Sequence, residues 1–220
     1  GSDTTAVALA AALHADKCEI YTDVDGVYTA DPRIVKNARK IDEIIYDEML
    51  ELATSGAKVL HNRSVEMAKK YGVELVVRSS LTSEEGTVVK EVVKMEKMLI
   101  TGVAADRNTV RISAIGVKDE PGIAFKLFNT LARNNINVDI ILQSVGRNGT
   151  KDISFTVSED DLQEALQILE EKKDVLTIKE ITYSTDVAKV SIVGAGMLSN
   201  PGVAAKMFES LFRSEERRVG

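Results

Sequence analysis

The sequence feature that most constrains this chain is an internal repeat. The stretch VRISAIGVKDEPGIAFKLFNTL at 110–131 returns as VSIVGAGMLSNPGVAAKMFESL at 190–211. Matching residues are 80 positions apart, since 201 − 121 = 80. The identical pairs used here are Pro121 and Pro201, Gly122 and Gly202, Ala124 and Ala204, Lys126 and Lys206, Phe128 and Phe208, and Leu131 and Leu211. A repeat of this length indicates that one supersecondary unit occurs twice.

Each copy has the pattern of an apolar strand, a Pro-Gly turn and a helix. In the first copy the apolar residues of the helix recur at i, i+3, i+4 and i+7, on one face: Ala124, Leu127, Phe128 and Leu131. Two strands, a second helix and a last strand follow, which gives the order β-α-β-β-α-β of a ferredoxin-like sandwich. The second copy holds only the first strand and helix, so it predicts the start of a second sandwich.

Residues 1–92 have a different texture, in which helices alternate with short apolar strands. This alternation is typical of an α/β layer with a parallel component. Ser2 or Asp3 is placed to cap a helix that runs to about Ala15. The segments CEIYT and VELVVRS have the composition of short buried strands.

Two more helices and a linker complete this half of the sequence. YDEMLELATSG is predicted to be a helix that ends at Gly56, and AKVLHNRSVEMAKKYG a helix that ends at Gly72. The stretch at 81–97 is charged and only weakly patterned. We therefore expect it to link the α/β layer to the repeats.

Composition argues against several classes of protein. The 220 residues carry a formal net charge of −6, which disfavours a nucleic-acid-binding surface as the main function. No apolar run reaches membrane-spanning length and the N-terminus lacks the layout of a signal peptide, so we expect neither nucleic acid nor membrane as a partner. The single cysteine, Cys18, permits no internal disulfide, and this fits a cytoplasmic protein.

The segment EIYTDVDGVYTADPR at 19–33 crowds three aspartates behind a short strand. Counted as an EF-hand loop from Asp23 it fails, because Tyr28 takes the place of the sixth-position glycine and Ile34 that of the twelfth-position glutamate. Tyrosine rings can pack on a base, Arg33 can pair with phosphate, and carboxylates can order the waters of Mg²⁺. From the residues alone, a plain turn is favoured over a nucleotide loop.

The Pro-Gly turns are a second candidate site. A helix N-terminus leaves N–H groups free and carries a partial positive charge, which suits a small carboxylate. Asp119, just before the first turn, can pair with an ammonium group, so the turn suits a zwitterionic amino acid. A plain turn explains a single copy at least as well, and the presence of two copies favours ligand binding. VGAGMLS half-resembles a dinucleotide fingerprint, but Ser199 replaces the third glycine, which favours a glycine-rich turn.

Basic and imidazole side chains give weaker signals. Lys58 lies near the expected start of a helix, where its amine can reach a phosphate. His61 and Arg63 are predicted to lie on a solvated helix face. His14, His61 and Cys18 lack the spacing of zinc ligands, so we expect no metal site built by the protein itself. No Ser-His-Asp set for nucleophilic catalysis is evident either.

Taken together, these motifs resemble one known family. TDVDGVYTADPR resembles the nucleotide-binding segment of the amino acid kinase superfamily, which includes glutamate, uridylate and carbamate kinases. GSDTTAVALAAAL resembles the more specific helix start of the aspartokinases, and GAKVLHNRSVEMA the helix that follows at their ATP site. The paired PG[IV]A units resemble their tandem ACT regulatory domains. The resemblance covers 1–212 and implies an α/β fold: the C-terminal part of an amino acid kinase α/β/α sandwich, followed by ferredoxin-like (βαββαβ) ACT domains.

The resemblance also implies a reaction and its site. Aspartokinases transfer the γ-phosphoryl group of ATP, which is bound with Mg²⁺, to the side-chain carboxylate of L-aspartate, the first step towards lysine, threonine and methionine. Carried over by motif, Asp3 is implied as catalytic, and Ser2 and Asp3 as binding L-aspartate. The residues implied to bind ATP are Thr22, Asp23, Tyr28, Thr29, Ala30, Asp31, Pro32, Arg33, Lys58 and Val59. The residues implied to bind an inhibitor, L-lysine or L-threonine, are Asp119, Glu120, Pro121, Gly122, Ile123, Ala124 and Gln143, with Asn200, Pro201, Gly202, Val203 and Ala204.

The resemblance further implies a division of the chain. We expect 1–92 to be the C-terminal part of the catalytic domain, 93–185 the first ACT domain and 186–212 the start of the second. The octapeptide at 213–220 breaks the helix pattern and matches a reading frame of a sequencing adapter, so we expect it to be an artefactual tail. The family's N-terminal lobe, with its glycine-rich lysine motif and aspartate-binding arginine, is missing. This polypeptide alone is therefore expected to fold poorly and to lack aspartokinase activity, and aspartyl hydroxamate formation would contradict that.

Some alternatives stay open. Certain aspartokinases also make a small regulatory subunit from an internal start, and Met95 and Met98 are placed for one. A non-catalytic amino-acid sensor is therefore the alternative function, and such a subunit is a candidate partner. A kinase fused to a dehydrogenase would need a nucleotide-binding fold beyond 220. Because ACT units commonly pair across subunits, a homo-oligomer is implied, while the identity of the inhibitor stays open.

Overall fold

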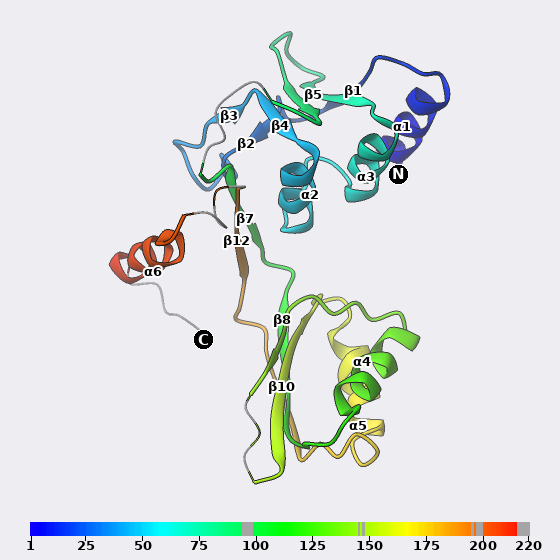
Figure 1. Cartoon of the computed structure of the whole chain (residues 1–220), viewed down its shortest axis with the longest axis vertical. Coiled ribbons are helices and arrows are strands. Elements are labelled where there is room, and N and C mark those ends of the chain that lie inside the picture. The colour runs from blue at the N-terminus through cyan, green and yellow to red at the C-terminus, as the bar shows by residue number, and fades with distance from the viewer. Residues whose placement is uncertain (94–98, 145, 147, 195, 197–199, 215–220) are drawn as a thin grey trace. The chain divides into compact units, whose positions relative to one another are not determined.

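The computed structural model describes residues 1–220 except 94–98, 145, 147, 195, 197–199 and 215–220. The chain divides into two compact units, one made of 1–106 with 190–220 and the other of 107–189 (Figure 1). These units do not follow the expected domain borders, and the assignment of domains stays a prediction. Met95, Met98 and the expected tail from 215 onwards lie outside the described residues.

The first unit is built on a mixed four-stranded sheet. Its elements are α1 (Ser2–Ala12), β1 (Lys17–Thr22), β2 (Val27–Tyr28), β3 (Lys40–Ile41), β4 (Glu43–Ile45), α2 (Tyr46–Thr54), α3 (Asn62–Tyr71), β5 (Glu74–Ser79), β6 (Thr87–Lys90) and β7 (Gly102–Asp106), and later β12 (Lys189–Val193) and α6 (Val203–Arg213). The strand order is β1-β5-β6-β4, with β1 parallel to β5, β4 parallel to β6, and β5 antiparallel to β6. The predicted α/β layer with a parallel component is confirmed.

Apolar side chains from three helices and the sheet form the core of this unit. Leu75 and Val77 of β5 have no exposed surface, and neither do Val7 of α1, Met49 of α2 and Val65 of α3. Burying side chains of this size contributes about 1.5–3 kcal/mol each relative to leaving them exposed. Helix α3 contacts both α1 and α2, so the three helices form one packed layer.

Two helix boundaries differ from the sequence prediction. Helix α1 ends at Ala12 rather than near Ala15, because His14 has a φ of 50°, which a right-handed helix cannot continue. Helix α3 begins at Asn62, later than predicted. His61 is its N-cap: the ring Nδ1 accepts the N–H of Arg63 at 3.2 Å. His61 is exposed as predicted, but it lies at the N-cap rather than on a helix face, whereas Arg63 is exposed within α3 as predicted.

The predicted linker at 81–97 was also wrong in part. Its residues Thr87–Lys90 form β6, which lies between β5 and β4 in the sheet. Thr87 and Val89 are fully buried. The Oγ1 of Thr87 accepts the N–H of Val27 at 2.8 Å and donates to the carbonyl of Ile41 at 2.6 Å. The charges on either side hide this strand, because four residues are too few to show a period-2 pattern clearly.

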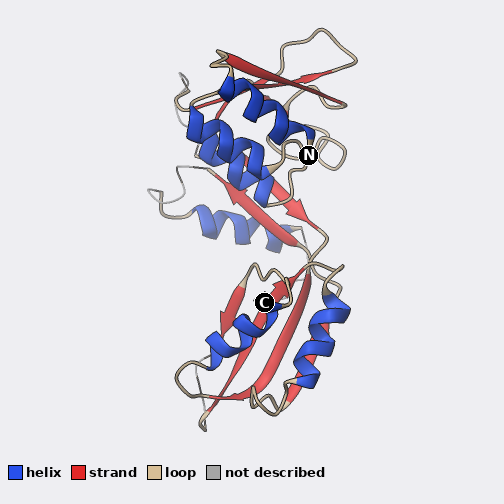
Figure 2. Ribbon diagram, turned by 90° about the vertical axis from the view of Figure 1, so that its right-hand side faces the viewer, coloured by secondary structure: helices blue, strands red, loops and turns tan. Residues whose placement is uncertain are grey.

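The second unit confirms the ferredoxin-like prediction. Its elements are β8 (Val110–Lys118), α4 (Ile123–Arg133), β9 (Ile141–Gln143), β10 (Thr150–Val157), α5 (Leu162–Glu171) and β11 (Glu180–Ser184). The sheet order is β11-β8-β10-β9 with every neighbouring pair antiparallel, and both helices cover one face (Figures 1 and 2). Phe128 packs edge-on against Phe155 in its core, with ring centroids 5.6 Å apart. The first of the two strands predicted after α4 is short, since β9 has three residues.

The sequence repeat is also a repeat in structure. Helices α4 and α6 both begin and end 80 residues apart, since 203 − 123 = 80 and 213 − 133 = 80. Gly122 and Gly202 are their N-caps, with left-handed φ values of 85° and 101°. Strand β12 of the second copy pairs with β7, which comes before the first copy in the chain. A tandem arrangement read from sequence does not predict this pairing.

Among the described residues, no helix is both long and apolar enough to cross a bilayer.

Candidate functional site

The start of α1 carries the two residues expected at the aspartate site. Gly1 is the N-cap and makes no side-chain capping bond, so the prediction that Ser2 or Asp3 caps the helix was wrong. Both residues lie inside the first turn, where the Ser2 hydroxyl donates to Asp3 Oδ1 at 3.3 Å. The carboxylate of Asp3 is favourable beside the positive end of the helix. The first-turn N–H groups are candidates for binding a further anion.

Thr22 and Asp23 lie at the C-terminal end of β1. The hydroxyl of Thr22 donates to Asp23 Oδ1 at 3.0 Å. The carbonyl of Thr22 accepts the N–H of Ser80 at 2.8 Å and its hydroxyl at 3.1 Å. Strand β1 therefore ends in a fixed position beside the end of β5.

Residues 25–28, which follow β1 shortly after Asp23, are held by a contact that the sequence did not indicate. The hydroxyl of Tyr28 donates to the carboxylate of Asp25, at 3.0 Å from each oxygen. Burial, and then the bond to Asp25, raises the pKa of Tyr28 above its ordinary value. Lys40 Nζ lies 3.9 Å from Asp25 Oδ2. Asp25 and Lys40 were missed because they are 15 residues apart, and no local spacing pairs them.

Asp31 and Arg33 form an ion pair across one intervening proline. The guanidinium donates to Asp31 through Nε at 3.0 Å and through Nη2 at 2.8 Å. This bond to Arg33 lowers the pKa of Asp31. The side chain of Arg33 is nevertheless 88% exposed, so it can exchange Asp31 for a phosphate without being pulled out of a core.

The backbone of the loop is closed between Thr29 and Arg39. The N–H of Thr29 donates to the Arg39 carbonyl at 2.9 Å, and the N–H of Arg39 donates to the Thr29 hydroxyl at 3.0 Å. Ala30 and Pro32, also expected to bind ATP, lie within this closed segment. Because the residues expected to bind ATP between Thr22 and Arg33 lie in it, we name residues 22–40 the nucleotide loop; that it binds a nucleotide stays a prediction.

Lys58 and Val59 lie elsewhere, in the turn before α3 rather than in a helix start. Lys58 is exposed, and Val59 packs partly against the core. In the described part of 1–106, no hydrogen bond or ion pair joins Ser2, Asp3 or Lys58 to residues 22–33. The structure therefore brings together the residues within the nucleotide loop, and their joint use with Asp3 and Lys58 stays a prediction.

The first Pro-Gly turn is surrounded by charges. Asp119 Oδ1 lies 3.1 Å from Lys151 Nζ. Glu120 pairs with Lys118 at 3.2 Å and with Lys126 at 3.5 Å, and the bond to Lys118, followed by Lys126, lowers its pKa. The remaining residues expected in this site divide by burial, because Ile123 faces the core whereas Pro121, Gly122 and Gln143 are exposed and Ala124 is intermediate.

The second Pro-Gly turn shares the backbone of the first and differs in charge. Asn200, which corresponds to Glu120, donates through Nδ2 to the Gly196 carbonyl at 2.9 Å. Val203 is buried, while Pro201, Gly202 and Ala204 are exposed. The glycines of VGAGMLS have a packing role: a Cβ at Gly194 would lie 2.5 Å from the Leu99 carbonyl oxygen. This close approach explains a glycine there without a dinucleotide, while Ser199 lies outside the described residues.

Two family models match the chain. The amino acid kinase family matches residues 1–79, and the ACT domain matches 110–172 and 190–215. An aspartokinase from Bacillus sp. (strain MGA3) is 56% identical over 212 residues, which are 96% of this chain and 52% of that protein. The chain thus spans about half the length of the curated relatives it matches.

Solved structures give the same result. E. coli aspartokinase III in complex with aspartate and ADP is 32% identical with a TM-score of 0.82, over 96% of this chain and 47% of that one. The same enzyme in complex with lysine and aspartate is 34% identical with a TM-score of 0.70, over 88% of this chain and 43% of that one. The regulatory subunit of aspartate kinase from Thermus thermophilus is 43% identical with a TM-score of 0.50, over 54% of this chain and 78% of that one. An amino acid kinase layer followed by ACT elements, at these identities and in this order, shows that the chain belongs to the aspartokinase family.

Proposed function

We propose that this chain carries the nucleotide-binding and regulatory parts of an aspartate kinase. The reaction is transfer of the γ-phosphoryl group of ATP to the side-chain carboxylate of L-aspartate, which gives 4-phospho-L-aspartate. The observation that supports this best is the nucleotide loop at the end of β1, in a chain 56% identical to an aspartokinase. A related enzyme was solved with aspartate and ADP, which are one substrate and the nucleotide product of the proposed reaction.

Each part of the proposed site has a physical role. Phosphoryl transfer depends mainly on positioning and on neutralising phosphate charge, because little covalent chemistry falls to the protein. We assign the free N–H groups at the start of α1 to a phosphate or carboxylate, with Ser2 and Asp3 at the aspartate. Residues 22–33 line the nucleotide, and Lys58 approaches its phosphates. The exposure of Lys58 and Arg33 leaves both side chains free to reorient towards a ligand.

Mg²⁺ is assigned to the nucleotide rather than to a site of the protein's own. Among the described residues, no group of three or more His, Cys, Asp or Glu side chains could hold a metal. Mg²⁺ commonly keeps several waters and uses one or two carboxylates plus substrate phosphates, so it needs no such group. Asp23, which accepts a hydrogen bond from the Thr22 hydroxyl, fits this role. When bound, the ion would neutralise phosphate charge.

We assign regulation to the Pro-Gly turns. The N-terminal N–H groups of α4 suit the carboxylate of an amino acid, and Asp119 suits its ammonium group. L-lysine and L-threonine are the proposed ligands, and a related structure contains lysine. A homo-oligomer that pairs through ACT domains, with a small regulatory subunit as a further partner, completes this proposal.

The proposal is tested by titrating the chain with MgADP in a calorimeter. Wild type is expected to bind, and Lys58→Ala should weaken binding about tenfold, the loss of one charge-assisted hydrogen bond. Lys172→Ala is the matched control, because Lys172 is an exposed lysine of the other unit. Absence of MgADP binding by wild-type chain that circular dichroism shows to be folded would contradict the proposal.

Titration with L-lysine and L-threonine tests the regulatory part separately. Asp119→Asn should weaken binding of the effector about tenfold through loss of its charged partner. Asp161→Asn is the control, because this helix N-cap makes no side-chain capping bond. Binding of neither amino acid would remove the sensing role.

A non-catalytic regulatory subunit is the second candidate function. It is supported by the likeness to the Thermus thermophilus subunit, of which this chain covers 78%. An amino-acid titration that succeeds while the MgADP titration fails would favour it.

A further inference from the structure

Strand β7 makes a hydrogen bond to the nucleotide loop. The N–H of Val103 donates to the carbonyl of Thr29 at 2.8 Å. Thr29 is also the residue that closes the loop against Arg39. Because both of its backbone polar groups and its hydroxyl are engaged, the position of Thr29 is set partly by a strand more than 70 residues further along the chain.

Glycines let β7 approach this closely. A Cβ at Gly102 would lie 3.2 Å from the Thr29 carbonyl oxygen and 3.1 Å from Leu52 Cδ2. A Cβ at Gly56, which follows α2, would lie 2.7 Å from the Ala105 carbonyl oxygen. Side chains at these two positions would push β7 away from the loop and from α2, so the contact depends on their absence.

The second repeat unit also contacts β7 and the residues leading into it. Strand β12 pairs with β7, and the N–H of Thr101 donates to the Val193 carbonyl at 2.7 Å. A Cβ at Gly194 would lie 2.5 Å from the Leu99 carbonyl oxygen and 2.8 Å from Ile100 Cα. Gly194 and Gly196 of the second repeat therefore lie directly against the backbone that leads into β7.

We propose that β7 is a positioning strand through which the second repeat unit sets the geometry of the nucleotide loop. The inference rests on the proposed function in assigning residues 22–40 to a nucleotide. Packed backbone segments cannot absorb a displacement of a few tenths of an ångström without moving their neighbours. A shift of β12 or of its turn is thus passed to Thr101, then along β7 to Val103 and Thr29. An amino acid bound at Asn200–Ala204 would act on ATP by this route.

The test is amide hydrogen exchange on the full chain without ligand. Gly194→Ala places a Cβ of the second repeat against the residues before β7. Gly102→Ala places a Cβ of β7 itself against the Thr29 carbonyl oxygen. Each should make the amides of residues 29–39 and of Val103 exchange about tenfold faster, roughly the loss of one backbone hydrogen bond. Amides of β1 and β5 should be unchanged, which a general loss of stability would not produce.

Matched controls separate coupling from glycine replacement itself. Gly149→Ala and Gly72→Ala introduce a Cβ at left-handed φ, of 74° and 67°, a backbone strain that the tested glycines do not have, and neither Cβ would meet an atom within 4 Å. Both controls should leave exchange in 29–39 at the wild-type rate. If Gly194→Ala does not fold, Gly196→Ala, which would place a Cβ 2.8 Å from Leu99 Cα, repeats the test.

The outcomes decide the proposal independently of nucleotide binding. If Gly102→Ala accelerates exchange in 29–39 but the changes at Gly194 and Gly196 leave it at the rate of Gly149→Ala, the proposal is overturned. If both sets accelerate it, β7 couples the repeat to the loop. Failure of wild type to bind MgADP would remove the proposed function while leaving this exchange result intact.

Discussion

Helices α4 and α6 have matching sequences and very different surroundings. Both begin after a glycine with left-handed φ, and in both the N–H of the fourth residue donates to that glycine's carbonyl at 2.9 Å. Thr130 and Ser210, 80 positions apart, each donate a hydroxyl to the carbonyl four residues before. The local structure of the repeat is therefore the same twice.

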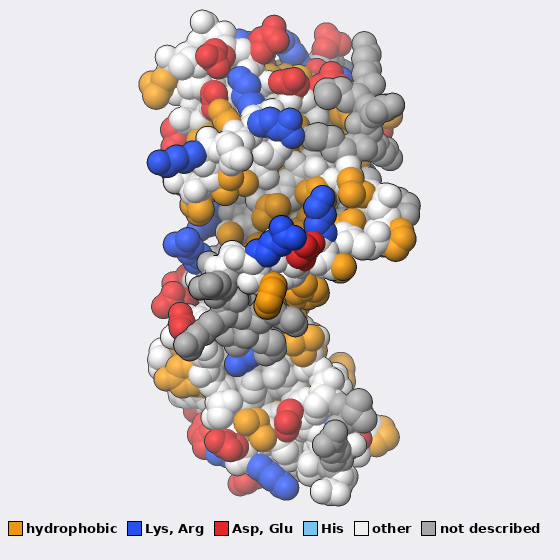
Figure 3. Space-filling model, turned by 90° about the vertical axis from the view of Figure 1, so that its left-hand side faces the viewer, with side chains coloured by type: hydrophobic (Ala, Val, Ile, Leu, Met, Phe, Trp, Pro, Cys, Tyr) orange, Lys and Arg blue, Asp and Glu red, His pale blue; other side chains and the backbone are white. Residues whose placement is uncertain are grey.

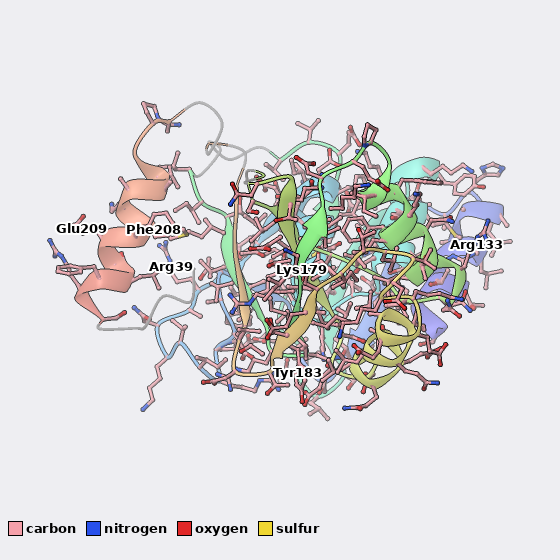
Figure 4. The ribbon with its side chains drawn as sticks, turned by 90° about the horizontal axis from the view of Figure 1, so that it is seen from below. Arg39, Arg133, Lys179, Tyr183, Phe208 and Glu209 are labelled. Atoms are coloured by element: carbon pink, nitrogen blue, oxygen red, sulfur yellow. The ribbon has the colours of Figure 1, made fainter. Side chains whose placement is uncertain are left out.

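Helices α4 and α6 differ in how much of their apolar surface is buried. Leu127 and Leu131 of α4 have no exposed surface, whereas the buried part of α6 is limited to Val203. Phe208 and Phe212 are 42% and 84% exposed, and the side of the molecule on which α6 lies shows hydrophobic side chains at its surface (Figure 3). Phe208 and Glu209 both project from α6 (Figure 4). Residues of β10, α5 and β11 complete the buried cluster around α4, whereas no α6 side chain belongs to a buried cluster of the described residues.

The two helices show which contributions to structure and stability are local. Caps and turn chemistry depend on a few neighbouring residues, so they are reproduced wherever the sequence is reproduced. Burial depends on partners from distant parts of the chain, so the same helix contributes differently in the two settings.

The largest expected effect comes from truncating matching apolar residues. Leu127→Ala should lower the free energy of unfolding of the second unit by about 2–5 kcal/mol, because it leaves a cavity in a fully buried position. Met207→Ala, 80 residues later, should cost less than about 1 kcal/mol, since it is only partly buried. Urea unfolding followed by circular dichroism measures both, and equal losses would contradict the comparison.

Much of the fold could be predicted from sequence because its signals are local. The apolar face of α4 and the order of elements after it were enough to predict the ferredoxin-like unit. Strand β6 and the pairing of β7 with β12 were not predicted, for different reasons. Thr87–Lys90 is too short to show its period, and β7 finds its partner more than 80 residues away.

The candidate site shows the same limit. Motif resemblance was enough to select Thr22, Asp23 and the segment up to Arg33, and the structure joins several of them by hydrogen bonds. The contacts of Asp25 with Lys40 and of Thr29 with Val103 come from chain segments with no common motif. These contacts depend on how distant chain segments pack together, which a single sequence does not reveal.

A smaller effect is expected at the two N-cap glycines. Gly122→Ala and Gly202→Ala both place a Cβ where no atom lies within 4 Å, so the cost is backbone strain alone, about 1–2 kcal/mol each. The two costs should agree within about 0.5 kcal/mol when measured by amide exchange in the first turns of α4 and α6. A much larger cost at Gly122 would show that burial, rather than local conformation, sets the glycine requirement.

The smallest effect is a difference in pH dependence between the two turns. Glu120 of the first turn corresponds to Asn200 of the second, which does not titrate. Lys118 and then Lys126 lower the pKa of Glu120 in the folded chain. Its stabilising contribution is therefore present above the ordinary carboxyl pKa and is lost as the pH falls through the lowered folded value.

This difference can be measured by following the first-turn amides of α4 and α6 by NMR as the pH is lowered through the carboxyl range. Exchange at the start of α4 should rise relative to its Glu120→Gln variant, whose own pH response should match that of α6. Glu164→Gln is the control, because Glu164 is the acidic residue in the first turn of a different helix, α5. If Glu120→Gln leaves the pH response of α4 unchanged, the charges around the first turn do not distinguish it from the second, and the difference between the repeats lies in burial alone.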